Sequence, residues 1–198
     1  MEGDLQDLQR LTMNKTTKMT KDNYIEIEVP ISSGSSWMDE LHSELRRYGV
    51  KWQNGFYHIT MAFIHNSTDE ERKAITDIVD DVLDGQNAFP MTFGELDAFT
   101  TRGKRTHVIY LRPTESNTAF NKMVNTLRSR ISEVTTEMEP DFQLHVTLGR
   151  VDASNVTLQE LKKAIEFVDA PEEDITLRKI NHQAFKEYGK PIKSWNLA

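Results

Sequence analysis

A strand pattern that carries a His-x-Thr triplet occurs twice in this chain, and each copy is followed by a helical pattern. The triplets lie at residues 58–60 and 145–147. Around each of them apolar and polar residues alternate with period two, which is typical of a strand with one buried face. The histidine and the threonine of each triplet therefore share a face, opposite the apolar residues. The repeat predicts two similar lobes, each with a His-x-Thr strand.

The rest of the chain predicts alternating strands and helices with short connections. Strands are expected at residues 24–29, 50–64, 91–99, 106–111, 142–151, 175–180 and 193–197. Helices are expected at residues 37–48, 120–131 and 158–168, and from a capping box at 67–71 to Gly85. Asn54 and Gly55 interrupt the second strand with a pair that favours a tight hairpin turn. These features favour an α+β fold of largely antiparallel sheets over a doubly wound parallel sheet.

The beginning of the chain differs in pattern from the rest. Residues 1–22 are polar and show no sustained periodicity, which predicts a mobile leader. Residues 23–198 contain no linker rich in Pro, Gly or Ser, so we expect a single bilobal domain there.

Net charge and residue types exclude several classes of protein. The formal net charge of −7 argues against an extended nucleic-acid surface but is compatible with a small or terminal phosphate ligand. The chain has no cysteine and no His-Glu-x-x-His pattern, so neither a metal nor another cofactor is expected. No run approaches the roughly 20 apolar residues that span a bilayer, which predicts a cytoplasmic protein without a membrane partner. We expect a monomer.

Several other features have a structural interpretation. The basic segment 102–105 is interpreted as a solvated hairpin tip, with a ligand contact as the alternative. His65 begins a His-x-Ser pattern, but it lies where a strand gives way to a helix cap. His42, His107 and His182 have no Ser or Thr two positions later, and His182 falls in a predicted polar loop. We interpret these three as structural or surface residues.

Two histidines that face one phosphate can hydrolyse a phosphodiester by in-line displacement. One imidazole takes a proton from the attacking oxygen while the other gives a proton to the leaving oxygen. Because an unperturbed imidazole has a pKa of about 6.5, one ring can be neutral and the other protonated near pH 7. The hydroxyls of Thr60 and Thr147 can hydrogen-bond the non-bridging oxygens. The sequence leaves open which of His58 and His145 is the base.

Strict alternation also predicts the direction of the residues that follow each triplet. Ala62 and Gly149 share the face of the histidines, where small side chains would leave room for a ligand. Phe63 and Arg150 fall on the opposite face, toward the core.

The residues that flank the two triplets resemble the paired motifs of a known family. Residues 58–64 are His-Ile-Thr-Met-Ala-Phe-Ile, and residues 145–150 are His-Val-Thr-Leu-Gly-Arg. Both are similar to motifs of the 2H phosphoesterases, most of all to their branch of 2′-5′ RNA ligases and cyclic nucleotide phosphodiesterases. The resemblance implies two pseudo-symmetric lobes with helices outside and an active-site groove between them. The activity it implies is hydrolysis of 2′,3′-cyclic phosphate ends or 2′-5′ linkages.

The resemblance also implies which residues act. The catalytic set would be His58, Thr60, His145 and Thr147, and the substrate contacts would be Arg150, Tyr24 and Phe99. Arg150 would reach the groove only if a bulge or a strand end turned it. Glu26 and Glu28 share the face of Tyr24, and carboxylates there would repel a phosphate. If that face lines the groove, we expect an unusual choice of substrate.

Three functions are compatible with these residues. The first is a metal-independent phosphodiesterase that acts on cyclic phosphate ends or 2′-5′ linkages of nucleotides or RNA. The second is a hydrolase of cyclic or 2′-5′ oligonucleotide immune signals. The third is a nucleotide-binding module of the same fold with little catalysis. Intact histidines favour the enzymes, and the sequence does not separate their substrates.

Overall fold

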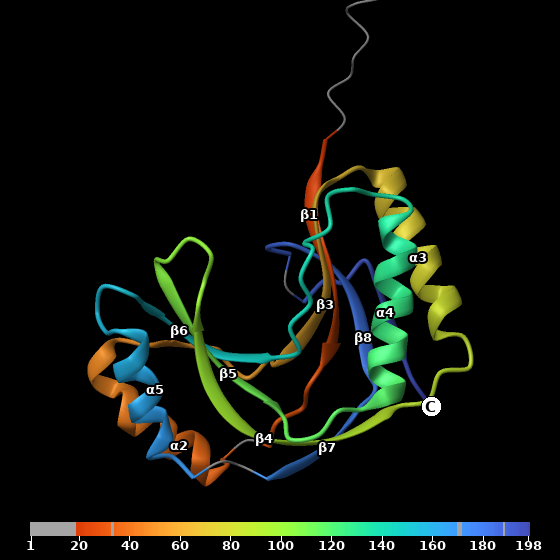
Figure 1. Cartoon of the computed structure of the whole chain (residues 1–198). Coiled ribbons are helices and arrows are strands. Elements are labelled where there is room, and N and C mark those ends of the chain that lie inside the picture. Colours follow the sequence, from red (N-terminus) through yellow and green to blue (C-terminus); the bar gives the residue numbers. More distant parts are fainter. Residues whose placement is uncertain (1–18, 33, 170–171, 188) are drawn as a thin grey trace, which may run out of the picture.

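Two antiparallel sheets, each covered on its outer side by a pair of helices, make up the molecule (Figure 1). The computed structural model describes residues 19–32, 34–169, 172–187 and 189–198. Most of the predicted leader, residues 1–18, lies outside the described residues. The predicted α+β class with largely antiparallel sheets is confirmed, since every strand pairing between the named strands is antiparallel.

The first sheet, sheet A, belongs to the lobe of the first triplet. Its strand order is β3-β1-β8-β9, with β1 at Lys21–Glu28, β3 at His58–Ser67, β8 at Lys179–Ala184 and β9 at Lys193–Asn196. Helices α3 (Asp69–Leu83) and α4 (Thr118–Ser132) cover its outer side. The predicted capping box starts α3, because the Thr68 hydroxyl accepts from the Glu71 amide while the Glu71 carboxylate accepts from the Thr68 amide.

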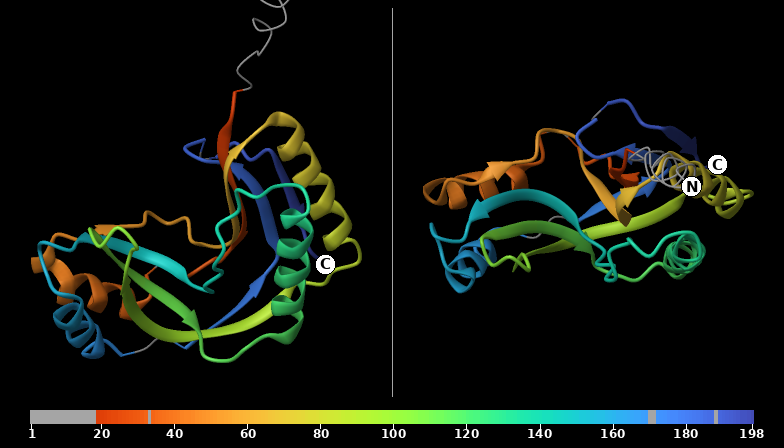
Figure 2. Two further views of the ribbon diagram at one scale, coloured as in Figure 1. Left: turned by 45° about the horizontal axis from the view of Figure 1, so that its top comes forward. Right: turned by 90° about the horizontal axis from the view of Figure 1, so that it is seen from above.

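The second sheet, sheet B, belongs to the lobe of the second triplet. Its strand order is β2-β6-β5-β4-β7, with β2 at Lys51–Trp52, β4 at Phe89–Thr100, β5 at Thr106–Pro113, β6 at Val146–Asp152 and β7 at Glu173–Leu177. Helices α2 (Ser36–Leu45) and α5 (Leu158–Glu166) pack together outside it. A 3-10 turn at Arg46–Tyr48 extends α2 and ends at Gly49, whose φ of 70° suits glycine. Figure 2 shows from two further directions that both helix pairs lie outside their sheets.

Two segments cross between the sheets, although the sequence predicts a hairpin in the first and a single strand in the second. In residues 50–64, β2 pairs with β6 in sheet B whereas β3 pairs with β1 in sheet A, so the hairpin predicted at Asn54 and Gly55 is wrong. In residues 175–180, β7 pairs with β4 and β8 pairs with β1, with Arg178 between them. Alternation reports the buried face of a strand but not its partner, which is why both crossings escaped prediction.

Several boundaries also differ from the prediction. Strand β1 begins at Lys21 rather than Tyr24, and β6 begins at Val146 rather than Phe142.

His182, predicted in a polar loop, lies in β8 and is fully buried. Its ring bonds Thr76 Oγ1 through Nδ1 (2.9 Å) and Asn23 Oδ1 through Nε2 (2.7 Å), which satisfies both nitrogens.

Strand β4 reaches both lobes. Its first residues pair with β7 and its later residues with β5, both within sheet B, and the strand runs from beside α4 to the side of α2 and α5 (Figure 1). Phe89 at its start packs edge-on against Phe120 of α4, with ring centroids 5.3 Å apart, and α5 packs on its far part. Among the described residues, no helix is long and apolar enough to cross a membrane.

Candidate active site

A groove of about 980 Å³ lies between the two sheets, and both His-x-Thr triplets line it. His58 and Thr60 come from β3, at the edge of sheet A. His145 directly precedes β6, and Thr147 is the second residue of that strand. The fold therefore brings the four residues that the sequence singled out into one cavity, although the two triplets are far apart along the chain.

Each triplet is followed by the same irregularity in its strand. In sheet A, Ile25 pairs with Ala62 and Glu26 with Thr60, so Met61 is an extra residue. In sheet B, Ile109 pairs with Gly149 and Tyr110 with Thr147, so Leu148 is an extra residue. An extra residue of this kind is a β-bulge, which reverses the alternation of the side chains that follow it.

The bulges overturn the facing that strict alternation predicts after each triplet. Phe63 and Arg150 line the groove, so the bulge that the family resemblance required for Arg150 is present. Ala62 and Gly149 turn toward the core instead of leaving room for a ligand. A Cβ on Gly149 would lie 2.8 Å from side-chain atoms of both Trp52 and Val50, so this glycine makes room for core packing.

Behind His58 lies the carboxyl group of Glu26, which is almost fully buried. His58 Nδ1 and Glu26 Oε2 are 3.5 Å apart, beyond a normal hydrogen bond, and neither atom has a hydrogen-bond partner among the residues that the structure describes. Burial is the main cause that lowers the pKa of His58 to about 4, and the nearby charges of His145 and Arg150 add to it. His58 therefore faces the groove as a neutral ring near pH 7.

Glu26 is one of several polar residues on sheet A that line the groove beside His58. Asn181 Nδ2 donates to Glu26 Oε1 (3.2 Å) and to Glu28 Oε1 (3.1 Å), and Lys179 pairs with Glu28 at 3.0 Å. Burial raises the pKa of Glu26 to about 7, opposed by the Asn181 hydrogen bond and assisted by the charge of Glu28. The face of Glu26 and Glu28 does line the groove, but Glu26 is partly protonated near neutral pH and repels a phosphate less than the sequence suggested.

Behind His145 lies a backbone carbonyl instead of a carboxyl group. Its Nδ1 is 2.8 Å from the carbonyl oxygen of Gln143, in the extended segment that leads into β6. Burial lowers the pKa of His145, although this hydrogen bond opposes the shift. The rings of Phe99 and Tyr110 stand edge-on to the imidazole, with centroids 5.4 Å and 5.8 Å away, and fix its plane.

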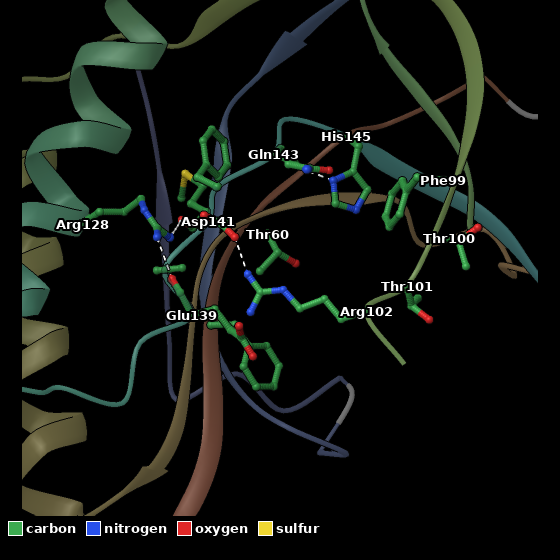
Figure 3. A pocket seen from close by; sticks show the side chains of 14 residues that line it. Thr60, Phe99, Thr100, Thr101, Arg102, Arg128, Glu139, Asp141, Gln143 and His145 are labelled. Carbon is green, nitrogen blue, oxygen red and sulfur yellow. Dashed lines mark hydrogen bonds and ion pairs between the residues drawn. The ribbon is translucent and has the colours of Figure 1, made fainter. Parts of the chain in front are cut away.

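The two aromatic residues predicted to bind substrate lie beside different histidines. Tyr24 stacks near His58 (6.0 Å between centroids) and on Phe63 (5.9 Å), and it lines the groove. Phe99 lies beside His145 and lines a second hollow of about 440 Å³ (Figure 3). Thr60, Phe63 and His145 line both cavities, so the groove and the second hollow adjoin at these residues.

The second hollow also receives part of the basic segment 102–105. Arg102 reaches from the β4–β5 turn toward Asp141 and forms an ion pair with it across the hollow (Figure 3). Arg128 of α4 donates to the carbonyl oxygens of Met61 (3.0 Å) and Glu139 (2.7 Å), which ties the wall of the hollow to α4. Of the basic segment, Arg102 therefore lies at the cavity, and a ligand contact from it stays a prediction.

The remaining histidines do not join the groove. His107 is buried and bonds Thr100 Oγ1 and the Val156 carbonyl oxygen, both at 2.9 Å. His65 contacts Glu139 at 2.6 Å on the far part of β3, and His42 packs against Trp52. Within the described part of the chain, no group of three His, Asp or Glu side chains is arranged to hold a metal ion.

Comparison with known proteins places the chain in a family. The sequence model of the 2′-5′ RNA ligase superfamily matches residues 32–182. The chain belongs to this superfamily. The resemblance to 2H phosphoesterases that the two triplets carry is thereby confirmed. No curated protein matches the sequence.

Solved structures share the superfamily fold at low sequence identity. Escherichia coli LigT complexed with 3′-AMP superposes with a TM-score of 0.65 and 18% identity, over 90% of this chain and 99% of that chain. Kluyveromyces marxianus Usb1 with uridine monophosphate has a TM-score of 0.65 and 10% identity, over 89% of this chain and 99% of that chain. The sequence did not predict that Phe63 and Asn181 line the groove of this superfamily member, or that the Gln143 carbonyl bonds His145. Only the bulges and the strand pairings reveal these features.

Proposed function

We propose that this protein is a metal-independent phosphodiesterase that hydrolyses 2′,3′-cyclic phosphate ends or 2′-5′ linkages of nucleotides or RNA. The observation that carries the proposal is the meeting of His58, Thr60, His145 and Thr147 in one groove. In-line displacement needs an acid and a base on opposite sides of phosphorus, and two imidazoles from facing lobes suit that geometry. Phosphoester chemistry is the general activity of the superfamily to which the chain belongs.

The groups around the histidines support a phosphate ligand. The hydroxyls of Thr60 and Thr147 can donate to the non-bridging oxygens as charge develops on them. Arg150 adds a positive charge from β6, close enough to lower the pKa of both histidines. A phosphate between the rings would counter that charge, so we expect substrate binding to raise both pKa values.

The shape of the cavity supports a substrate with a group on each side of the phosphate. The groove holds both histidines with Tyr24, Trp52 and Phe56, and the second hollow, which adjoins it at His145, is lined by Phe99. Aromatic faces of this kind can stack on nucleobases. The LigT and Usb1 structures contain 3′-AMP and uridine monophosphate, which motivates nucleotides as the first substrates to test.

The test is a product screen with purified protein in EDTA. A 2′,3′-cyclic mononucleotide, a cyclic-phosphate-ended RNA and a 2′-5′ dinucleotide would be incubated separately, and products would be separated by chromatography. We expect hydrolysis of at least one of them, undiminished by EDTA. Tight mononucleotide binding in calorimetry without any product would instead favour the nucleotide-binding module, and preferred cleavage of cyclic oligonucleotides would favour the immune-signal hydrolase.

A monomeric state and a cytoplasmic location remain predictions of the sequence. Light scattering on the eluate of a sizing column checks the first, and a dimer mass of about twice 22.9 kDa would contradict it. Fractionation of cells that express the chain checks the second.

A further inference from the structure

The two histidines differ in what their buried nitrogens can bond. A backbone carbonyl oxygen can only accept a hydrogen bond, so His145 Nδ1, 2.8 Å from the Gln143 carbonyl, carries a hydrogen. In the neutral ring the other nitrogen, Nε2, is then without a hydrogen and is the one left for the groove. His145 is therefore set up to accept a proton.

The carboxyl group behind His58 can either donate or accept, depending on its protonation. Glu26 Oε1 is already held by the Asn181 amide, so Oε2 is the oxygen left to face His58. Oε2 and His58 Nδ1 are both buried, lie 3.5 Å apart, and have no hydrogen-bond partner within the described part of the chain. A shift of a few tenths of an ångström would join them in a hydrogen bond, and no other acceptor or donor competes for either atom among the described residues.

We propose that protonated Glu26 is a positioning residue that donates from Oε2 to His58 Nδ1, which keeps the hydrogen of His58 on Nε2 and makes His58 the acid and His145 the base. The proposal rests on the proposed phosphodiesterase function and deepens it, because it assigns the two roles that the sequence leaves open. The carbonyl behind His145 requires a hydrogen on Nδ1, whereas the carboxylic acid behind His58 requires Nδ1 to be free of hydrogen, so the two histidines differ in tautomer.

The surroundings of Glu26 favour its protonated form. Burial raises the pKa of Glu26 to about 7 and lowers that of His58 to about 4, so a single proton shared by the pair resides on the carboxyl group. From β1 the charge of Glu28 strengthens this, whereas Lys179 and the Asn181 amide from β8 oppose it. From the second lobe, Arg150 and His145 disfavour a charged His58.

The proton transfers in hydrolysis then balance. Water gives a proton to His145 Nε2 as its oxygen bonds to phosphorus, and the bond from phosphorus to the leaving oxygen breaks. The leaving oxygen takes the proton from His58 Nε2, while His58 Nδ1 receives the proton of Glu26 Oε2. After product release, His145 loses its proton to solvent and the Glu26–His58 pair regains one, which restores the starting state.

Nitrogen-15 NMR of the histidine side chains tests the assignment without any substrate. At pH 6, with His58→Ala and His145→Ala to assign the signals, we expect hydrogen on Nε2 of His58 and on Nδ1 of His145. A His58 ring with hydrogen on Nδ1, or on both nitrogens, at this pH overturns the proposal. This result stands even if the wild-type protein cleaves none of the phosphodiesters tested, an outcome that would reject the proposed function alone.

Glu26→Gln tests the role in turnover, because an amide can still donate to Nδ1 but cannot supply a proton. The acid would then have to be a charged His58, whose burial disfavours it, so we expect the alkaline limb of the kcat profile to move to lower pH by at least about one unit. At pH 7 we expect kcat to fall at least about tenfold with KM little changed. An alkaline limb at the same pH as in the wild type, or a loss of kcat by the same factor at every pH, overturns the proposal.

Two further variants separate positioning from a general structural effect. In a His58→Ala background, Glu26→Gln should cost nothing more, whereas a loss of the same size as in the wild type overturns the proposal. Asn181→Ala removes the amide that stabilises the ionised carboxylate, so the alkaline limb should move to higher pH, opposite to Glu26→Gln. A shift of both variants in the same direction contradicts the assignment, and Asn181→Ala keeps the test available if Glu26→Gln fails to fold.

Discussion

The two His-x-Thr strands have the same backbone path but different neighbours. Both place the triplet at the start of a strand, and both have a bulge directly after the threonine. They differ in the side chain that the bulge turns into the groove, which is Phe63 in one lobe and Arg150 in the other. They differ also behind the imidazole, where Glu26 faces His58 and a carbonyl faces His145.

This comparison separates geometry from chemistry. The repeated strand and bulge bring two imidazoles and two hydroxyls to the same cavity, and identical local structure in both lobes is enough for that. In the proposed mechanism one imidazole is the acid and the other the base, and identical local structure would give both rings the same protonation. The residues outside the triplets, on β1 and before β6, distinguish the lobes. The following predictions break or sharpen this comparison, in order of decreasing effect.

The largest effect is expected from removing either imidazole. His58→Ala and His145→Ala should each lower kcat/KM on the preferred phosphodiester by about 10²–10⁴-fold, the usual contribution of general acid–base catalysis. The two variants should change the pH profile of the rate in different ways. His145→Ala should lose the acid limb, which lies below pH 6.5 because the pKa of His145 is lowered. His58→Ala should lose the alkaline limb. Steady-state rates from pH 4.5 to 9 measure both.

His65→Ala is the matched control for these variants. His65 lies in the same strand as His58 and begins a His-x-Ser pattern, but its own side chain lines neither the groove nor the second hollow. It should retain activity within about twofold, as a surface substitution does. Full activity in either catalytic variant would reject the two-histidine mechanism.

A second difference between the lobes is an acid-sensitive histidine in sheet A. Burial lowers the pKa of His182 from 6.5 to about 4, so the folded state binds fewer protons than the unfolded state between these values. The contribution of His182 is therefore complete above pH 6.5 and is lost as pH falls toward 4, by about 3 kcal/mol in total.

Urea unfolding at pH 7.5, 6.5, 5.5 and 4.5 measures this dependence. The free energy of unfolding should fall with pH in the wild type and should fall less steeply in His182→Gln. Equal slopes for the two proteins would show that another group causes the acid sensitivity.

At the two core positions that follow the bulges, Ala62 and Gly149, exchanging Ala and Gly should change the free energy of unfolding by different amounts. Gly149→Ala adds a Cβ that meets Trp52 and Val50 at 2.8 Å, so we expect a loss of about 1–3 kcal/mol of unfolding free energy. Ala62→Gly removes a methyl group and adds backbone freedom, which should cost about 1 kcal/mol or less. Thermal and urea unfolding of both variants compare them, and a stable Gly149→Ala would contradict the packing described for β6.

The smallest effect is expected at the groove positions after the bulges. Arg150→Ala should raise KM and lower kcat/KM by about tenfold, because a charge-assisted contact to phosphate is lost at an exposed site. Since the charge of Arg150 lowers the pKa of both histidines, the acid limb should also move to higher pH. Arg130→Ala, which removes a surface ion pair with Asp81, is the control and should change neither.

Sequence patterns predicted where helices and strands lie along the chain better than they predicted which strands pair. The strands that carry the two triplets, the capping box at Thr68 and the stop at Gly49 all follow from local chemistry and are present. The crossings at residues 53–57 and at Arg178 were missed, because a strand alternates in the same way in either sheet. Assigning a strand to a sheet requires long-range contacts that no local pattern encodes.

The same distinction holds for the site. The histidines and threonines were found from the sequence because their pattern repeats. The groove position of Phe63 was missed and that of Arg150 was found only through the family resemblance, because a one-residue bulge reverses the alternation without any signal of its own. The apposition of Glu26 and His58 depends on the pairing of β1 with β3, so it too lay beyond a reading of either strand alone.

Strand β4 links the two halves of the molecule. It belongs to sheet B, while Phe89 at its start is buried against Phe120 of α4, which covers sheet A, so the halves share an apolar contact beside the ladders of β4 with β5 and β7. Widening the cleft at this end would pull the two rings apart and expose them to water, which costs free energy in proportion to the apolar area uncovered. The contact therefore favours the closed spacing of the two lobes.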